Sequence, residues 1–111
     1  MSIHITLKTA ALKDKFPAVS DDIIKYSSHA LAALKEINEK QTPTQLEGFL
    51  TRQMSQIAAN SDICPRVSGE VIEFVKGLCI VLERNPAKTW TPKQASAFLI
   101  AALESEQELS A

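Results

Sequence analysis

Histidine and cysteine are the residues of this chain best suited to catalysis or metal binding, and there are few of them. The histidines are His4 and His29, and the cysteines are Cys64 and Cys79. A structural zinc site needs several such ligands, some of them only a few residues apart. None of these side chains has a neighbour at that spacing, so we expect no metal site and no cofactor.

Cys64 is the one candidate for a catalytic nucleophile. It lies just before an expected helix start, where the helix dipole can lower the pKa of a thiol. A simple loop position or packing also explains it, and Cys79 lies in an apolar run that is typical of a reduced core thiol. The three glycines are scattered and form no phosphate-binding loop. We therefore expect no enzymatic activity and no catalytic residue, and an enzyme that uses a reactive Cys64 is our third hypothesis.

Arg52, Gln53 and Gln56 are the residues that could contact nucleic acid. A recognition helix uses Arg, Lys, Asn or Gln to reach bases and phosphates. The same helix carries Glu47, however, and the net charge of −1 gives no general attraction to a polyanion. We expect an ordinary solvent face here, and a helix-turn-helix-like nucleic-acid-binding regulator is the alternative hypothesis.

Three apolar residues favour binding to another protein. Ile80 falls on the only polar stripe of its helix, and Ile100 falls on the outer side of the last helix. Trp90, the only tryptophan, precedes that helix, and tryptophan is enriched among binding hot spots. Trp90 could instead pack over Ala95 as a hydrophobic staple. These residues are the candidate partner-binding site.

The composition is that of one globular domain. The chain has 111 residues, of which 45% are hydrophobic and 23% charged, and its few Gly and Pro argue against a loop-rich β fold. The longest apolar run is shorter than the roughly 20 residues that a bilayer requires, so we expect no membrane span. No apolar segment typical of a secretory signal follows the amino terminus, so we expect a cytoplasmic location.

The apolar run from Val71 to Leu82 is predicted to be the central helix. Glu73, Lys76, Ile80 and Arg84 follow one helical stripe, and nearly everything outside that stripe is hydrophobic. A helix that is apolar over most of its circumference is buried on several sides. The other segments are therefore expected to pack around it.

Capping patterns predict where the helices begin. Ser20 is an N-cap followed by two acidic residues, and the motif Thr-Pro-x-Gln at Thr42 and at Thr91 forms two capping boxes. We expect helices from residue 21 to about 39, from 43 to about 60, from 69 to about 84, and from 92 until the chain frays at Glu104. The residues expected to face the core in the first, second and fourth helices recur at helical spacing: Ile23, Ile24, Ser27, Ala30, Leu31, Leu34, Ile37, Leu46, Phe49, Leu50, Met54, Ile57, Ala95, Phe98, Leu99, Ala102 and Leu103.

The first residues have a different pattern. Ile3, Ile5 and Leu7 alternate with polar residues, which predicts extended chain. We therefore expect a short extended N-terminal arm over residues 1–13. A strand completed by another copy, or a short helix running to Phe16, are the alternatives.

The two halves of the remaining chain resemble each other. Several residues of the first helix and the segment before it are identical to the residues 48 positions later, in the third helix and the segment before it. In the same way, several residues at the start of the second helix are identical to those 49 positions later, at the start of the fourth. The identities are Asp14, Pro17, Val19, Ser20, Ile24 and Leu34 with Asp62, Pro65, Val67, Ser68, Ile72 and Leu82, and Thr42, Pro43, Gln45, Phe49 and Leu50 with Thr91, Pro92, Gln94, Phe98 and Leu99. Because capping signals are common to all helices, chance similarity is the competing explanation.

These patterns predict an all-α fold. We expect a single helical domain over residues 14–111, a four-helix domain built from two similar helical hairpins (about 14–61 and 62–111) with a pseudo-two-fold arrangement. The expected function is a small cytoplasmic protein–protein interaction module without catalytic chemistry, acting as an adaptor, a regulator or an inhibitor. Its partner would be another protein or a second copy in a homodimer, and not nucleic acid or a membrane.

Overall fold

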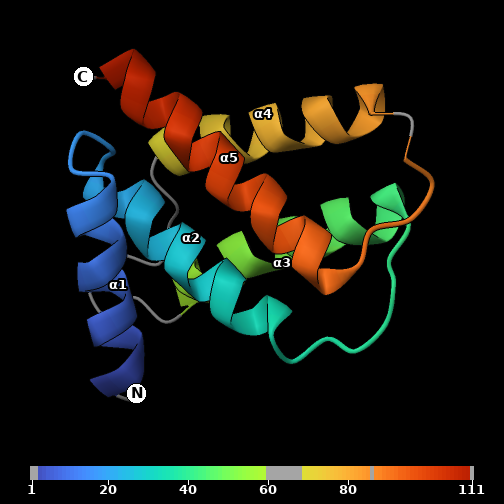
Figure 1. The fold of residues 1–111 in the computed structure, drawn as a ribbon, viewed down its shortest axis with the longest axis horizontal. Coiled ribbons are helices and arrows are strands. Elements are labelled where there is room, and N and C mark those ends of the chain that lie inside the picture. The colour runs from blue at the N-terminus through green and yellow to red at the C-terminus, as the bar shows by residue number, and fades with distance from the viewer. Residues whose placement is uncertain (1–2, 60–68, 86, 111) are drawn as a thin grey trace.

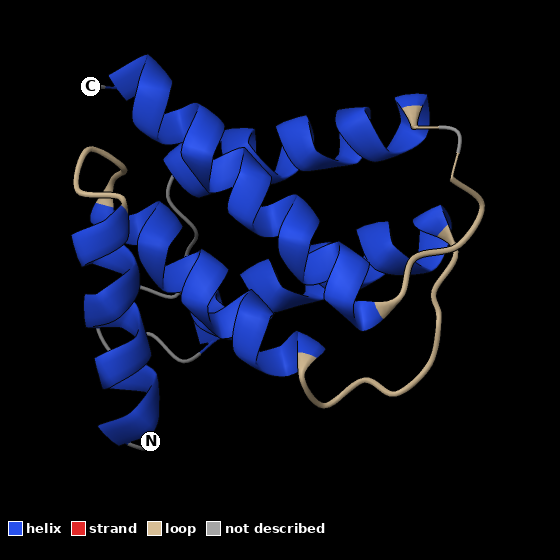
Figure 2. Cartoon of the chain, in the orientation of Figure 1, coloured by secondary structure: helices blue, strands red, loops and turns tan. Residues whose placement is uncertain are grey.

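The helix α2 (Asp21–Leu34) lies at the centre of an all-α fold. A computed structural model describes residues 3–59, 69–85 and 87–110, and these form five helices and no strand (Figures 1 and 2). The other helices are α1 (Ile3–Lys15), α3 (Pro43–Ala59), α4 (Gly69–Arg84) and α5 (Pro92–Ser110). α2 packs against each of them, whereas the main partners of α4 are α2 and α3.

The prediction that residues 71–82 form the central helix was therefore wrong about position, although the segment is helical. On α4, Val71, Phe74, Val75, Leu78 and Leu82 are buried, and the opposite side faces solvent. α2 is central because it is buried on more sides, and Tyr26, Ser27 and Ala30 are fully buried in it. Its small residues Ser27, Ser28 and Ala30 leave room for neighbouring helices on those sides.

The N-terminal segment is a helix and not an extended arm. α1 spans Ile3–Lys15 and packs along α2, so the alternative of a short helix reaching Phe16 is the correct one (Figure 1). A strand here would have no sheet edge among the described residues to pair with, whereas a helix satisfies its own backbone groups. Thr9 also donates a hydrogen bond to the Ser28 hydroxyl at 3.1 Å, which ties α1 to α2.

The predicted caps of three helices are confirmed. The Ser20 hydroxyl accepts the Ile23 N–H at 3.4 Å and begins α2. In the first capping box, the Thr42 hydroxyl accepts the Gln45 N–H at 3.2 Å while the Gln45 side chain accepts the Thr42 N–H at 2.9 Å. Thr91 and Gln94 make the same pair of bonds, at 3.1 and 2.9 Å. Ser68, the residue that matches Ser20 in the second hairpin and is the expected N-cap there, lies outside the described residues.

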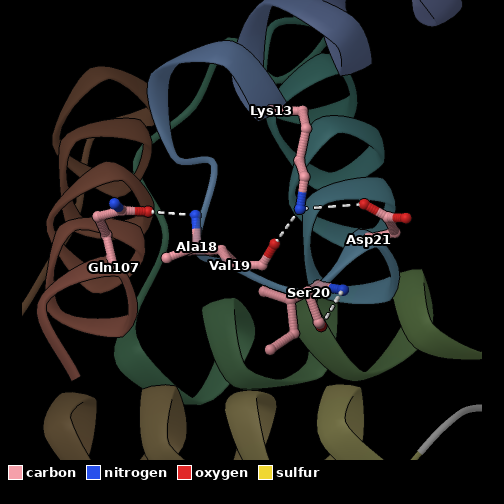
Figure 3. A network of polar contacts seen from close by, with 7 residues as sticks. Lys13, Ala18, Val19, Ser20, Asp21 and Gln107 are labelled. Atoms are coloured by element: carbon pink, nitrogen blue, oxygen red, sulfur yellow. Dashed lines mark hydrogen bonds and ion pairs between the residues drawn. The ribbon is translucent and has the colours of Figure 1, made fainter. Parts of the chain in front are cut away.

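Two helix ends differ from the prediction. α2 ends at Leu34 and not near Glu39, since the N–H groups of Glu36 and Ile37 each bond to the carbonyl three residues earlier and tighten the last turn. α5 does not fray at Glu104 but continues to Ser110. Gln107 explains part of that length, because its side-chain oxygen accepts the N–H of Ala18 at 2.8 Å (Figure 3).

The turn between α1 and α2 is a polar junction that joins three helices. The Lys13 amine donates to the Val19 carbonyl at 2.5 Å and lies 3.1 Å from the Asp21 carboxylate (Figure 3). The Gln107 contact brings the last turns of α5 to the same place. α1 and the C-terminal end of α5 are thereby fixed to the start of α2.

The loops that precede α3 and α5 meet in an isolated antiparallel β-bridge. Gln41 and Trp90 donate their N–H groups to each other's carbonyls, at 2.8 and 2.7 Å. Each residue stands immediately before one of the Thr-Pro-x-Gln capping boxes.

The core lies where α2 meets α3, α4 and α5, and it contains most of the predicted inward residues. The fully buried ones include Ile24, Leu34, Leu46, Leu50 and Leu99. Leu31, Ile37, Met54, Ile57, Phe98 and Ala102 are partly buried and pack against that core. The radius of gyration of 13.5 Å is close to the roughly 13 Å expected for a compact chain of this length.

Candidate protein-binding surface

The outer side of α4 exposes large apolar side chains. Ile72 is 36% exposed, Ile80 47% and Val81 50%. The predicted exposure of Ile80 is confirmed, whereas Ile72 and Val81 had been expected to be buried with the rest of the run. They are exposed because α4 is covered on one side only.

Cys79 lies beside this surface, and the thiol faces an acidic group of α3. Burial raises the pKa of Cys79, and the Glu47 carboxylate raises it further through its charge and by accepting a hydrogen bond from the thiol. Glu83 acts in the same direction through its charge. A thiol in this setting stays protonated at neutral pH, which makes it a weak nucleophile.

Trp90 belongs to the interior more than to the surface. Its ring packs against Phe98, with 5.3 Å between the ring centroids and 52° between the planes. The residue is half-buried against the core, and its indole nitrogen is buried without a hydrogen-bond partner in the described part of the chain. These contacts give Trp90 a structural role.

Ile100 also packs inward. It was expected on the outer side of α5, but it is partly buried and contacts the core. Of the three residues in the candidate partner-binding site, Ile80 alone presents a largely exposed side chain.

The residues considered for nucleic acid do not share one face. Arg52 and Gln56 are exposed, but Gln53 is only 4% exposed. The Gln56 side-chain oxygen lies 3.2 Å from His29 Nε2, so it is occupied by a contact between α2 and α3. Arg52 is exposed on α3.

The catalytic hypothesis rests on a residue outside the described part of the chain, since Cys64 lies between residues 59 and 69. The side chain of His4 is not among those described either. Within residues 3–59, 69–85 and 87–110, no three His, Cys, Asp or Glu side chains lie close enough together to hold a metal ion. None of the helices found there has the length and apolarity needed to cross a membrane.

Sequence reasoning missed two features of the α4 surface. Glu47 was considered only as a negative charge that disfavours nucleic-acid binding. Its contact with Cys79 joins residues on two helices, so no pattern of neighbouring residues could reveal it. The exposure of Ile72 was also missed. No signal in the sequence suggested it, since Ile24, the identical residue at the offset of 48, is buried on α2.

Comparisons of the chain with protein-family models, with curated proteins and with solved structures found no match.

Proposed function

We propose that this protein is a protein–protein interaction module, an adaptor, regulator or inhibitor, that binds its partner through the outer side of α4. The observation that supports this most is the exposure of Ile72 and Ile80, which lie about 80° apart on the outer side of α4. Scattered exposed apolar residues are ordinary, but apolar side chains gathered on one exposed face are typical of interaction sites. Trp90 and Ile100 are no longer part of the proposed site, because both pack against the core.

Site-specific photo-crosslinking tests this proposal. A photoreactive amino acid at position 80, in the full chain in cells of its source, is expected to give a discrete covalent adduct with another protein. The same group at Lys25, an exposed position on α2, is the control and is expected to give none. Absence of an adduct at position 80, or an equal adduct at position 25, contradicts the proposal.

We also propose that the hairpins α2–α3 and α4–α5 are related copies with an approximate two-fold axis. Two pairs of matched residues support this. Gln41 and Trp90 correspond at the offset of 49 and bond to each other, and Tyr26 and Phe74 correspond at 48 and have ring centroids 6.2 Å apart. Contact between matched residues is what a two-fold axis produces. Equal losses of stability on removing the two matched caps, as predicted in the Discussion, test this proposal.

A further inference from the structure

α1 covers a defined stripe of α2. Thr9 of α1 bonds to Ser28 of α2, and a shallow, largely apolar groove of about 340 Å³ remains along their contact. The groove is lined by residues of α1, α2 and α5: Ala11, Leu12, Lys15, Ser28, Leu31, Ala32, Lys35 and Ser96. α1 therefore docks along α2 beside the first half of α5.

The corresponding stripe of α4 has no such helix over it among the described residues. At the offsets of the repeat, Ser28, Leu31, Ala32 and Lys35 correspond to Lys76, Cys79, Ile80 and Glu83, and Ser96 of α5 corresponds to Glu47 of α3. Glu47 does face Cys79, as this correspondence requires. Burial distinguishes the two stripes at two of these positions: Ser28 is buried and Ala32 partly buried, whereas their counterparts Lys76 and Ile80 are exposed.

The charges of the two stripes differ in a consistent direction. Lys35 of the α2 stripe corresponds to Glu83 on the α4 side, and the neutral Ser96 corresponds to Glu47. Glu73 adds a third carboxylate near the start of the stripe, and Lys76, 3.7 Å from Glu73, and Arg84 are the cations on the same side of α4. Three carboxylates against two cations leave a net charge of −1 around the apolar residues. A segment lying there is favoured by positive charge.

α1 itself has the required chemistry. It carries Lys8, Lys13 and Lys15 against one acidic residue, Asp14, and its own helix is already held on α2 by the contacts of Lys13 and Thr9. α1 is therefore held on α2, and a helix that binds the α4 stripe in the same way would come from another chain.

We propose that the stripe formed by Ile72, Lys76, Cys79, Ile80 and Glu83 on α4, together with Glu47 on α3, binds a basic amphipathic helix of a partner protein. The partner helix lies on α4 as α1 lies on α2. Apolar residues of that helix cover Ile72 and Ile80, and its Lys or Arg side chains meet Glu47 and Glu83. This rests on the proposed function and names the site and the class of partner.

Binding of a labelled peptide to the full chain tests the proposal. The probe is residues 3–15 of this chain, IHITLKTAALKDK, with capped ends and a fluorophore, and the readout is fluorescence anisotropy. We expect saturable binding that weakens about tenfold or more with Ile80→Glu and with Glu47→Lys, since each change disrupts a central contact. Val81→Glu is the matched control, because Val81 is as exposed as Ile80 but lies about 100° further round the helix. It is expected to leave the affinity within about twofold.

A second peptide with all three lysines replaced by glutamate is expected not to bind. Circular dichroism of each variant shows that the helices are intact, since the substituted residues are not in the core. No binding of the lysine peptide, or binding that Ile80→Glu and Glu47→Lys leave unchanged, overturns the proposal. Light scattering gives a further test. If the chain is a dimer and Ile80→Glu makes it a monomer, the stripe binds a second copy of the chain and the proposal is overturned. If position 80 crosslinks to another protein but the peptide does not bind, this inference is wrong and the proposed function still holds.

Discussion

Gln41 and Trp90 exchange both of their backbone hydrogen bonds, at 2.8 and 2.7 Å, although they are far apart in the sequence. Each residue immediately precedes a Thr-Pro-x-Gln capping box, so the bridge fixes the starts of α3 and α5 relative to each other. The loop that joins α2 to α3 and the loop that joins α4 to α5 are therefore held together at one point. The four helices α2–α5 share one core, and Trp90 packs against it.

Trp90→Ala is expected to destabilise the fold and not to act on a binding surface. The substitution removes the contact with Phe98 and leaves a cavity beside the bridge. The expected loss is about 2 kcal/mol, below the 3–5 kcal/mol typical of fully buried aromatic residues, and urea denaturation measures it. Trp90→Phe keeps an aromatic ring and removes the buried, unpartnered nitrogen, so it should cost less. A Trp90→Ala variant as stable as the exposed control Lys88→Ala would contradict this role.

The two capping boxes should contribute equally to stability. Thr42→Ala and Thr91→Ala each remove a side-chain acceptor for the N–H three residues later, and each is expected to cost about 1 kcal/mol of unfolding free energy. Thr44→Ala is the control, because Thr44 lies in the first turn of α3, close to the Thr42 capping box. It should change stability by less than about 0.5 kcal/mol. Very unequal losses for Thr42→Ala and Thr91→Ala would argue against two equivalent hairpins.

The fold should lose stability as the pH rises above about 10. Burial raises the pKa of Tyr26, and the nearby Cys79 thiolate raises it further; the hydroxyl donates to the Leu50 carbonyl at 2.9 Å. The unfolded chain releases this proton at about pH 10, whereas the folded chain retains it to higher pH. Above that pH the unfolded state binds fewer protons, so the stability contributed by the protonated phenol decreases as pH rises.

The absorbance of tyrosinate measures this directly, because Tyr26 is the only tyrosine in the chain. Its appearance should coincide with the loss of helical circular dichroism on alkaline titration. Tyr26→Phe should make stability less dependent on pH in this range. Tyrosinate forming at about pH 10 in a chain that is still folded would refute the buried hydrogen bond.

Gln107→Ala tests whether the end of α5 is fixed to the first turn. The substitution leaves the Ala18 N–H without the acceptor it has at 2.8 Å, so we expect a loss of about 1 kcal/mol and faster amide hydrogen exchange at Ala18. The neighbouring exposed residue Glu108 provides the control, Glu108→Ala, which should leave the exchange at Ala18 unchanged. Equal exchange in both variants would mean that α5 is not anchored by this contact.

The features that sequence predicted well are those set by residues close together in the chain. The caps at Ser20, Thr42 and Thr91 each depend on a side chain and an N–H three residues away, so the local pattern contains the whole interaction. The periodicity of α2, α3 and α5 likewise identified most of the core. The local pattern was wrong for the N-terminal segment. The alternation of Ile3, Ile5 and Leu7 is compatible with a strand, but a strand there has no sheet edge to pair with among the described residues.

Features that depend on contacts between helices were not predictable in this way. The apolar circumference of residues 71–82 indicated a central helix, but which helix is covered on several sides is decided by how the others pack. Gln53 is buried although its type favours solvent, and Glu47 contacts Cys79 from another helix. The exposed side of α4 is therefore a property of the assembled fold.

Nuclear magnetic resonance of the isotope-labelled full chain, titrated with the peptide of residues 3–15, tests the central claim most directly. The account predicts saturating chemical-shift changes concentrated on α4 between Ile72 and Glu83 and around Glu47 of α3, with the resonances of α1 and of its contact with α2 unchanged. Shifts confined to α2 through displacement of α1, or no shifts at all, would contradict it.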